Sequence, residues 1–376
     1  MIQRSWRKTG ALLLSTLLLT GGVRAAEDEA LAKARSALEA VRRLKDVDLQ
    51  AKPALKAAID RLAVQLQGQP ELVELTRDFH LTNQFPAVFR FVIDHPTDPA
   101  TGDGLRLLLA EQPALITAGL GDTNQAPSLL TGLGNLAQRD TVPLLLPWLT
   151  DSPGRSLAAR RTALRGLLKT PEGATALVES AAAGSLPADL RPLAATELQA
   201  VRWPKIKADA AKVLPPPPRN DKALPPIGEL VRRSGDVANG ARIFRRPEVA
   251  CSTCHQINGE GIDFGPKLSE IGAKLGKDAL YDAILEPSSG ISFGYEAWMF
   301  TLKNGDDAFG LLASETEDEL LVKTQGGTLT KYRKADVAKR EKQPQSIMPE
   351  GLTATLTATE LVDLVEYLAS LKKATP

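Results

Sequence analysis

Apolar residues recur at helical spacing through most of residues 27–214, and Gly, Pro and Asp interrupt the pattern at short intervals. Apolar positions three and four residues apart place one face of a helix against a core. The stretch from Ala30 to Leu44 already follows this spacing. The first half of the chain is therefore predicted to be a succession of short helices.

A short motif returns in this half every 34 residues. Each copy keeps an apolar, a small and a second apolar residue in place, in Leu130-Thr131-Gly132-Leu133, Leu164-Arg165-Gly166-Leu167 and Leu198-Gln199-Ala200-Val201. This period suits one helix hairpin per repeat, with the small residue where neighbouring helices approach closely. The segment resembles HEAT-type repeats from about Phe85 to Leu214 and is expected to form an α-solenoid, with an irregular helical bundle as the alternative.

Prolines mark a domain boundary after these helices. Four follow one another at Pro215 to Pro218, and Pro225-Pro226 comes after a short polar stretch. Such a segment cannot continue a helix and favours an extended spacer. We therefore expect a helical repeat domain over residues 26–214, a proline-rich linker over 215–234 and a second domain over 235–373.

The second domain is predicted to begin and end with helices and to hold a small sheet between them. Asp236 is a candidate N-cap for a helix to about Arg246, and Thr357-x-x-Glu360 is a capping box before apolar residues at helical spacing. Asn304-Gly305 and Gly326-Gly327 are turn signals between short alternating runs, so an antiparallel insertion is expected at about residues 295–335. The predicted fold class is thus mainly α with a small inserted antiparallel β-sheet.

The first 25 residues have the pattern of a secretory signal peptide. Basic residues precede the apolar stretch from Ala11 to Thr20, and Val23-Arg24-Ala25 precedes Ala26 with small residues near a cleavage point. A spanning helix needs about twenty apolar residues, so an uncleaved anchor is the weaker alternative. The sequence predicts export, to the periplasm or beyond, with no transmembrane segment after cleavage.

Charge and composition narrow the function. With 46 basic and 45 acidic residues, the formal net charge is +1, which disfavours binding to a nucleic-acid backbone. Aromatic residues make up only 5%, a composition that favours packed helices over a large β-sandwich.

The two cysteines carry the clearest chemical signal. Cys251-Ser252-Thr253-Cys254-His255 is a C-x-x-C-H motif, in which two thiols can bond to the vinyl groups on one edge of a porphyrin while the adjacent His binds its iron. A zinc site would need further Cys or His nearby, and a thioredoxin-like pair would need a βαβ context. The motif therefore predicts one covalent haem c with His255 as an iron ligand.

Methionine usually supplies the second axial ligand in cytochromes that transfer electrons. Past the signal peptide, the sequence offers Met299 and Met348. Met299 lies in a run of alternating apolar and polar residues and is expected to be a strand residue that faces the core. Met348 lies in an irregular segment before the last helix. Met348 is therefore the favoured ligand, because a loop can be directed at the iron.

Residues 235–372 resemble class I cytochrome c, and more closely the haem-binding domain of planctomycete and verrucomicrobial exported proteins. The segments that carry the resemblance are Cys251 to His255, Asp263 to Leu268, Ile284 to Pro287, Ser346 to Leu352 and Leu361 to Leu371. The resemblance implies that the carbonyl of Pro266 accepts the proton of the outer His255 ring nitrogen, that Leu268 packs on the porphyrin and that Met348 is the sixth ligand. It also implies that the first and last helices cross closely at Gly240, near Phe244 and Tyr367.

The expected function is that of an exported monohaem c-type cytochrome, an electron carrier rather than an enzyme, with a helical domain that docks a redox partner. The resemblance suggests a periplasmic dehydrogenase as that partner. Two alternatives remain from the sequence: a haem enzyme or gas sensor with an open or weakly held sixth site, and an interaction scaffold with an auxiliary haem.

Overall fold

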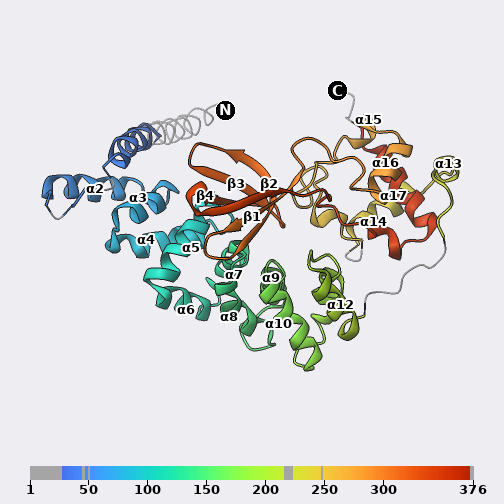
Figure 1. The fold of residues 1–376 in the computed structure, drawn as a ribbon, viewed down its shortest axis with the longest axis horizontal. Helices are drawn as coiled ribbons and strands as arrows, with labels where there is room; N and C mark the ends of the chain where they lie inside the picture. The colour runs from blue at the N-terminus through green and yellow to red at the C-terminus, as the bar shows by residue number, and fades with distance from the viewer. Residues whose placement is uncertain (1–27, 45–46, 50, 216–222, 247–248, 373–376) are drawn as a thin grey trace, which may run out of the picture. The chain divides into compact units, whose positions relative to one another are not determined.

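The computed structural model describes residues 28–44, 47–49, 51–215, 223–246 and 249–372. The predicted signal peptide and most of the first proline run lie outside these residues. The described chain is mainly helical with one small antiparallel sheet, as the sequence predicts (Figure 1). It divides into two compact units. One unit contains residues up to 94 together with 103–115, and the other contains 95–102 and 116–376.

The first unit is built from helices around one apolar core. Residues 28–42 are helical, and their buried Ala34 and Leu38 pack in one cluster with Ile59, Leu66 and Leu72. Pro53 at the start of its helix fits a position where the missing N–H is not needed. The helices that begin in this unit are α2 (Pro53–Gln65), α3 (Glu71–Phe79) and α4 (Phe85–Asp94); α5 (Pro99–Glu111) and α6 (Pro113–Gly121) each have residues in both units.

In the second unit, the helices before the linker follow each other with short connections. Gly166 lies where the 34-residue motif places a close approach: a Cβ there would be 2.8 Å from the Cα of Gly134 on the preceding helix pair. Gly134, the partner of Gly166, lies two residues after Gly132, the small residue of the preceding motif copy. The helices are α7 (Ala126–Leu136), α8 (Val142–Leu145), α9 (Leu157–Leu167), α10 (Pro171–Ala182), α11 (Arg191–Leu198) and α12 (Pro204–Val213).

The third copy of the motif departs from the prediction. The helix α11 ends at Leu198, so Ala200 and Val201 lie beyond it, and Ala200 is exposed. A repeat read from spacing alone cannot detect where a helix ends. The solenoid stays a prediction.

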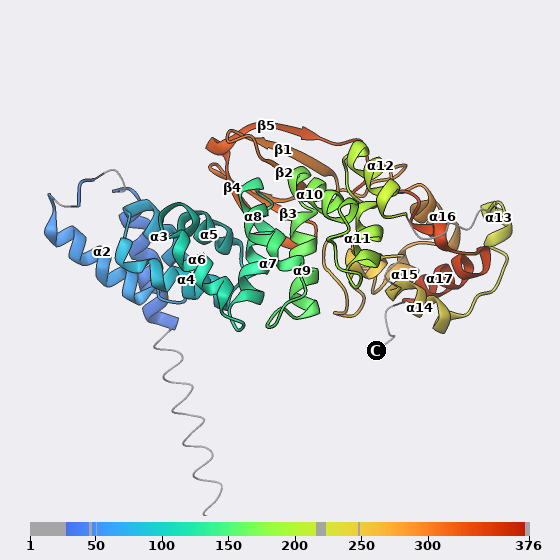
Figure 2. The same cartoon turned by 90° about the horizontal axis from the view of Figure 1, so that it is seen from below.

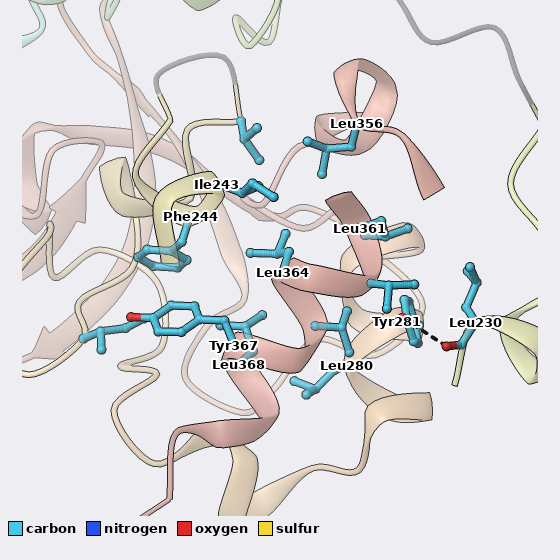
Figure 3. Packing of buried hydrophobic residues seen from close by; sticks show 14 residues of the cluster. Leu230, Ile243, Phe244, Leu280, Tyr281, Leu356, Leu361, Leu364, Tyr367 and Leu368 are labelled. Atoms are coloured by element: carbon cyan, nitrogen blue, oxygen red, sulfur yellow. Dashed lines mark hydrogen bonds between the residues drawn. The ribbon is translucent and has the colours of Figure 1, made fainter. Parts of the chain in front are cut away.

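The C-terminal helices enclose a separate apolar core. Leu230, Phe244, Tyr281, Leu361 and Leu364 are all buried in it (Figure 3). The capping box predicted at Thr357 and Glu360 is present, with both of its hydrogen bonds formed. The helices are α13 (Ile227–Leu230), α14 (Val237–Arg245), α15 (Ile271–Lys274), α16 (Lys277–Leu285) and α17 (Ala358–Ser370).

The helices α14 and α17 cross at a glycine. Asp236 caps α14 by accepting from the backbone N–H groups of Ala238 and Asn239, as predicted. A Cβ at Gly240 would overlap the backbone of Asp363 and lie 2.7 Å from Cβ of Tyr367. The rings of Phe244 and Tyr367 meet edge-on with centroids 6.0 Å apart. The close crossing that the resemblance implied is thus present.

The inserted sheet has five antiparallel strands in the order β4-β3-β2-β1-β5 (Figure 2). Gly305, Gly326 and Gly327 have positive φ at the two predicted turns. The sheet extends past the predicted boundary at 335, because the charged β5 pairs with β1 at the sheet's edge. The strands are β1 (Ala297–Leu302), β2 (Asp307–Glu315), β3 (Glu319–Thr324), β4 (Thr328–Arg333) and β5 (Val337–Lys342).

Met299 lies in β1, as predicted, but does not face the core of the sheet. The buried residue of that core is its neighbour Phe300, which packs with Leu302 and Val322, and adjacent residues in a strand point to opposite faces. Met299 is half-buried. The expectation of a core-facing Met299 is therefore wrong, because a period of two leaves open which set of positions is buried.

Within the second unit, the sheet contacts the helical part that precedes the linker, including α7, which lies against β4. The guanidinium of Arg202 stacks between the rings of Trp203 and Phe309 and lies 3.7 Å from a carboxylate oxygen of Asp307. Arg139 donates to the carbonyl of Asn304. A Cβ at Gly326 would be 3.8 Å from Nζ of Lys169. No helix in the described part of the chain is both long and apolar enough to cross a membrane.

Candidate haem-attachment site

The two cysteines lie on a single tight turn. A 3-10 helix runs over Cys251–Thr253, and the backbone N–H of His255 donates to the carbonyl of Cys251 at 2.9 Å. Ala250 enters this turn with φ of 58°. Both thiols are free, half-buried and close to the histidine in sequence and space.

Burial raises the pKa of the Cys251 thiol to about 12 and also raises the pKa of Cys254. Both thiols therefore stay protonated at neutral pH. A dithiol redox pair instead needs a nucleophilic thiolate with a lowered pKa. The environment of these two cysteines therefore does not favour the thioredoxin-like alternative.

The ring of His255 is held by a backbone carbonyl. Its Nδ1 lies 2.8 Å from the carbonyl oxygen of Pro266, which is the contact that the resemblance implied. Because this oxygen can only accept, Nδ1 is the protonated nitrogen and Nε2 is left to bind a metal. Burial lowers the pKa of His255, which favours the neutral imidazole that ligates iron.

Gly265 fits against the same ring. A Cβ at this position would lie 2.8 Å from Cε1 of His255, closer than a side chain tolerates. Its backbone N–H donates to the carbonyl of Cys254 at 2.7 Å. Sequence reasoning did not assign Gly265 a role, since only the folded loop shows what its missing side chain would meet.

Apolar side chains continue from the turn into the core of the C-terminal helices. Cys251, Leu268 and Ile271 are partly buried and pack against that core. A planar apolar ligand next to the turn would cover such half-exposed groups. The residues present thus fit a porphyrin: two thiols on one turn, a neutral imidazole with an oriented ring, and apolar neighbours.

Met348 lies in an irregular segment, as predicted, between β5 and the last helix. Its backbone N–H donates to Oγ of Ser346, and the N–H of Ser346 donates to Oγ of Ser288. Met348 itself is half-buried. These bonds fix the segment to the loop after α16, while its role toward iron stays a prediction.

No group of three or more His, Cys, Asp or Glu side chains that could hold a metal ion occurs within the described ranges. Comparison with known families adds one finding: the family model of cytochrome c matches residues 237–318. The match begins at α14 and includes the cysteine turn, His255, Pro266 and Leu268, whereas Met348 lies outside it. No curated protein matches the chain.

Proposed function

We propose that this chain is a haem protein, because residues 237–318 form a cytochrome c domain. Such a domain implies haem c, bound covalently with its iron. A haem-binding domain of this family transfers electrons. We further propose that the chain is an exported carrier with a single haem that accepts and passes one electron at a time. Under this proposal it performs no bond chemistry of its own.

The observation that carries this proposal is the turn Cys251–Thr253 followed by a histidine whose Nδ1 is hydrogen-bonded to Pro266. Bound haem supplies the one-electron couple of its iron. The chain's own groups would attach and orient it: Cys251 and Cys254 would hold the porphyrin through their thiols, and the Pro266 carbonyl sets the tautomer and basicity of His255. The adjoining apolar core limits access of water.

Met348 is proposed as the sixth ligand, with Leu268 against the porphyrin. The bond from Ser346 to Ser288 supports this assignment, because it ties the Met348 segment to the loop that follows α16. A thioether ligand favours ferrous iron and closes the metal to small molecules.

The helices of residues 26–214 are proposed to form HEAT-like repeats that dock a redox partner. The 34-residue motif and the close approach of Gly134 and Gly166 support a repeat. Export rests on the basic and apolar pattern of residues 1–25, and a periplasmic dehydrogenase as the partner rests on the resemblance to planctomycete and verrucomicrobial proteins.

Extraction with acidified acetone tests covalent attachment. The colour should stay with the polypeptide, and the intact mass should exceed that of the chain by one haem, because one attachment motif is present. The chain with both Cys251→Ala and Cys254→Ala is the control and should lose its colour to the solvent. A wild-type protein whose colour moves into the solvent would contradict the proposal.

The partner is tested by copurification of the native protein and identification of the redox-active protein that accompanies it. Reduction of the haem by that protein and its substrate is the expected result. A partner retained by the helical part alone, with no electron transfer to the haem, would instead identify an interaction scaffold.

A further inference from the structure

The loop that carries Pro266 is joined to the cysteine turn by backbone hydrogen bonds. Ile262 donates to the carbonyl of Ser252 at 3.0 Å, and Phe264 and Gly265 donate to that of Cys254 at 3.1 and 2.7 Å. Leu268 donates to the carbonyl of Gln256 at 2.9 Å. The position of the Pro266 carbonyl against His255 therefore depends on how this loop, residues 262–268, is held.

The inserted sheet holds this loop from outside. Nζ of Lys323, in β3, lies 2.8 Å from a carboxylate oxygen of Asp263, and the side chain of Lys323 is only 20% exposed. At the β3–β4 turn, a Cβ at Gly327 would be 2.9 Å from the carbonyl oxygen of Asp263 and 3.0 Å from Cγ2 of Ile262. An ion pair and a close backbone approach thus meet at the same residue.

A surface ion pair alone would contribute little to the position of the loop, because solvent screens its charges. Two features distinguish this pair. Lys323 is mostly buried, and the carboxylate it binds lies one residue from Phe264, which is itself 2% exposed and hydrogen-bonded to Cys254. The Lys323 ammonium also lowers the pKa of the Asp263 carboxyl, so this carboxyl stays charged at neutral pH.

We propose that Lys323 and Asp263 are positioning residues for His255, through which the inserted sheet fixes the Pro266 carbonyl against Nδ1 and so sets the reduction potential. The inference rests on the proposed function, because the potential exists only when haem is attached. It gives the sheet a role in setting the reduction potential of the iron, although neither proposed ligand, His255 or Met348, lies in the sheet.

The proposal predicts whether the reduction potential rises or falls in two variants, Lys323→Met and Asp263→Asn. A hydrogen bond from Nδ1–H to a carbonyl makes the imidazole a more basic ligand, which favours ferric iron. Loosening the loop weakens that bond, so Lys323→Met and Asp263→Asn should both raise the potential. A simple change of local charge would instead give opposite signs, with loss of the cation lowering the potential and loss of the anion raising it.

Lys267 provides a matched control. Its Nζ lies 3.5 Å from the same carboxylate, but it belongs to the loop itself, so its removal takes away a charge without releasing the sheet. Lys267→Met should therefore leave the potential unchanged or lower it slightly. The conservative Lys323→Arg should restore the wild-type value, and the double variant Lys323→Met with Asp263→Asn should shift no further than the larger single change.

These potentials are measured by redox titration of the full-length, haem-loaded chain. Upward shifts for both single variants, with none for Lys267→Met, support the proposal. Opposite signs for Lys323→Met and Asp263→Asn, or no shift in either, overturn it.

A second readout does not use the potential. In the full-length chain as purified, Lys323→Met should speed hydrogen exchange at the amides of Phe264 and Gly265, and Lys267→Met should not. Equal exchange in the two variants overturns the proposal. Because exchange is measured whether or not haem is attached, it separates failure of the positioning role from failure of the proposed function, which appears as wild-type protein without covalent haem.

Discussion

The carbonyl of Pro266 and the absent side chain of Gly265 constrain His255 more directly than any charged group near it. One orients the ring through Nδ1, and the other leaves room for Cε1. Neither contribution depends on the chemistry of a side chain. A search for titratable residues alone would therefore find the ligand and miss what orients it.

Met348 and Met299 form a natural pair of variants. Met348→Ala should leave haem attached, lower the reduction potential, abolish the methionine-to-iron charge-transfer band and admit carbon monoxide, because the thioether that stabilises ferrous iron is gone. Met299→Ala, in β1, should change none of these. Absorption spectra and redox titration of both variants decide the matter, and the reverse pattern would show that the ligand was assigned to the wrong methionine.

Lys169 should make the free energy of unfolding depend on pH in the alkaline range. Desolvation lowers its pKa from 10.5 to about 8, although Glu197 acts in the opposite direction. Between pH 8 and 10.5, the unfolded chain then binds more protons at this site than the folded chain, so its contribution to the free energy of unfolding rises with pH across that window.

Urea unfolding of Lys169→Met at pH 7, 8, 9 and 10 measures this contribution by difference from the wild type. From pH 8 to pH 10, the free energy of unfolding of the wild type should rise relative to that of Lys169→Met. The exposed Lys207→Met, in α12, is the control. A pH-independent gap for Lys169→Met would mean that its ammonium is well solvated in the folded chain.

At the scale of elements, the crossing of α14 and α17 combines the close backbone approach at Gly240 with hydrogen bonds to one buried side chain. The buried carboxylate of Asp363 accepts from the backbone N–H of Asp236 at 2.7 Å and from Nδ2 of Asn239 at 2.8 Å. It thus connects the N-terminal turn of α14 to the middle of α17. The sequence shows Asp363 only as a polar interruption among apolar residues, so this role could not be predicted from it.

Gly240→Ala should separate these two helices. The new methyl group overlaps the backbone of Asp363, which cannot move aside as a side chain could, and the expected loss is about 2–4 kcal/mol in the free energy of unfolding. Gly228→Ala is the control, because nothing lies within 4 Å of its Cβ position. Chemical denaturation of both variants should show a loss for Gly240→Ala alone, and equal midpoints would place the helices further apart than described.

The sequence could predict those elements whose formation depends on residues close together in the chain. The Asp236 cap, the Thr357–Glu360 box and the glycine turns of the sheet depend on residues a few positions apart, and all are present. The strand β5 was missed because its charged residues show no alternation and it forms only by pairing with β1. The pair of Lys323 and Asp263 joins residues 60 positions apart, which no local pattern can predict.

At the scale of the whole molecule, the apolar core of the C-terminal helices begins inside the segment predicted as the linker, because Leu230 in α13 is one of its buried members. Its buried members lie between Leu230 and Leu368. The sheet, however, also contacts Arg202 and Arg139 from the preceding helical part. Haem attachment and the docking of helices onto the sheet therefore depend on different sets of contacts.

A fragment of residues 224–376, exported with a signal peptide and matured with haem, should be red, soluble and reducible, with the absorption spectrum of the full chain. Its midpoint of thermal unfolding should be lower, because Asp307 and Phe309 lose the Arg202 guanidinium. The complementary helical fragment should remain helical without redox activity. A colourless or aggregated 224–376 fragment would show that the preceding helices help to form the haem domain's core.

The pairing of β1 with β5 has a further consequence. Trp298 lies opposite Lys342, and the backbone N–H of Gln343 donates to the carbonyl of Ala297, so the sheet's first and last residues leave it side by side. A short bridge from Ala297 to Gln343 could therefore replace the sheet without lengthening the chain path to Met348. Such a replacement would take Lys323 away from Asp263, while the cysteine turn would keep its own backbone hydrogen bonds to residues 262–268.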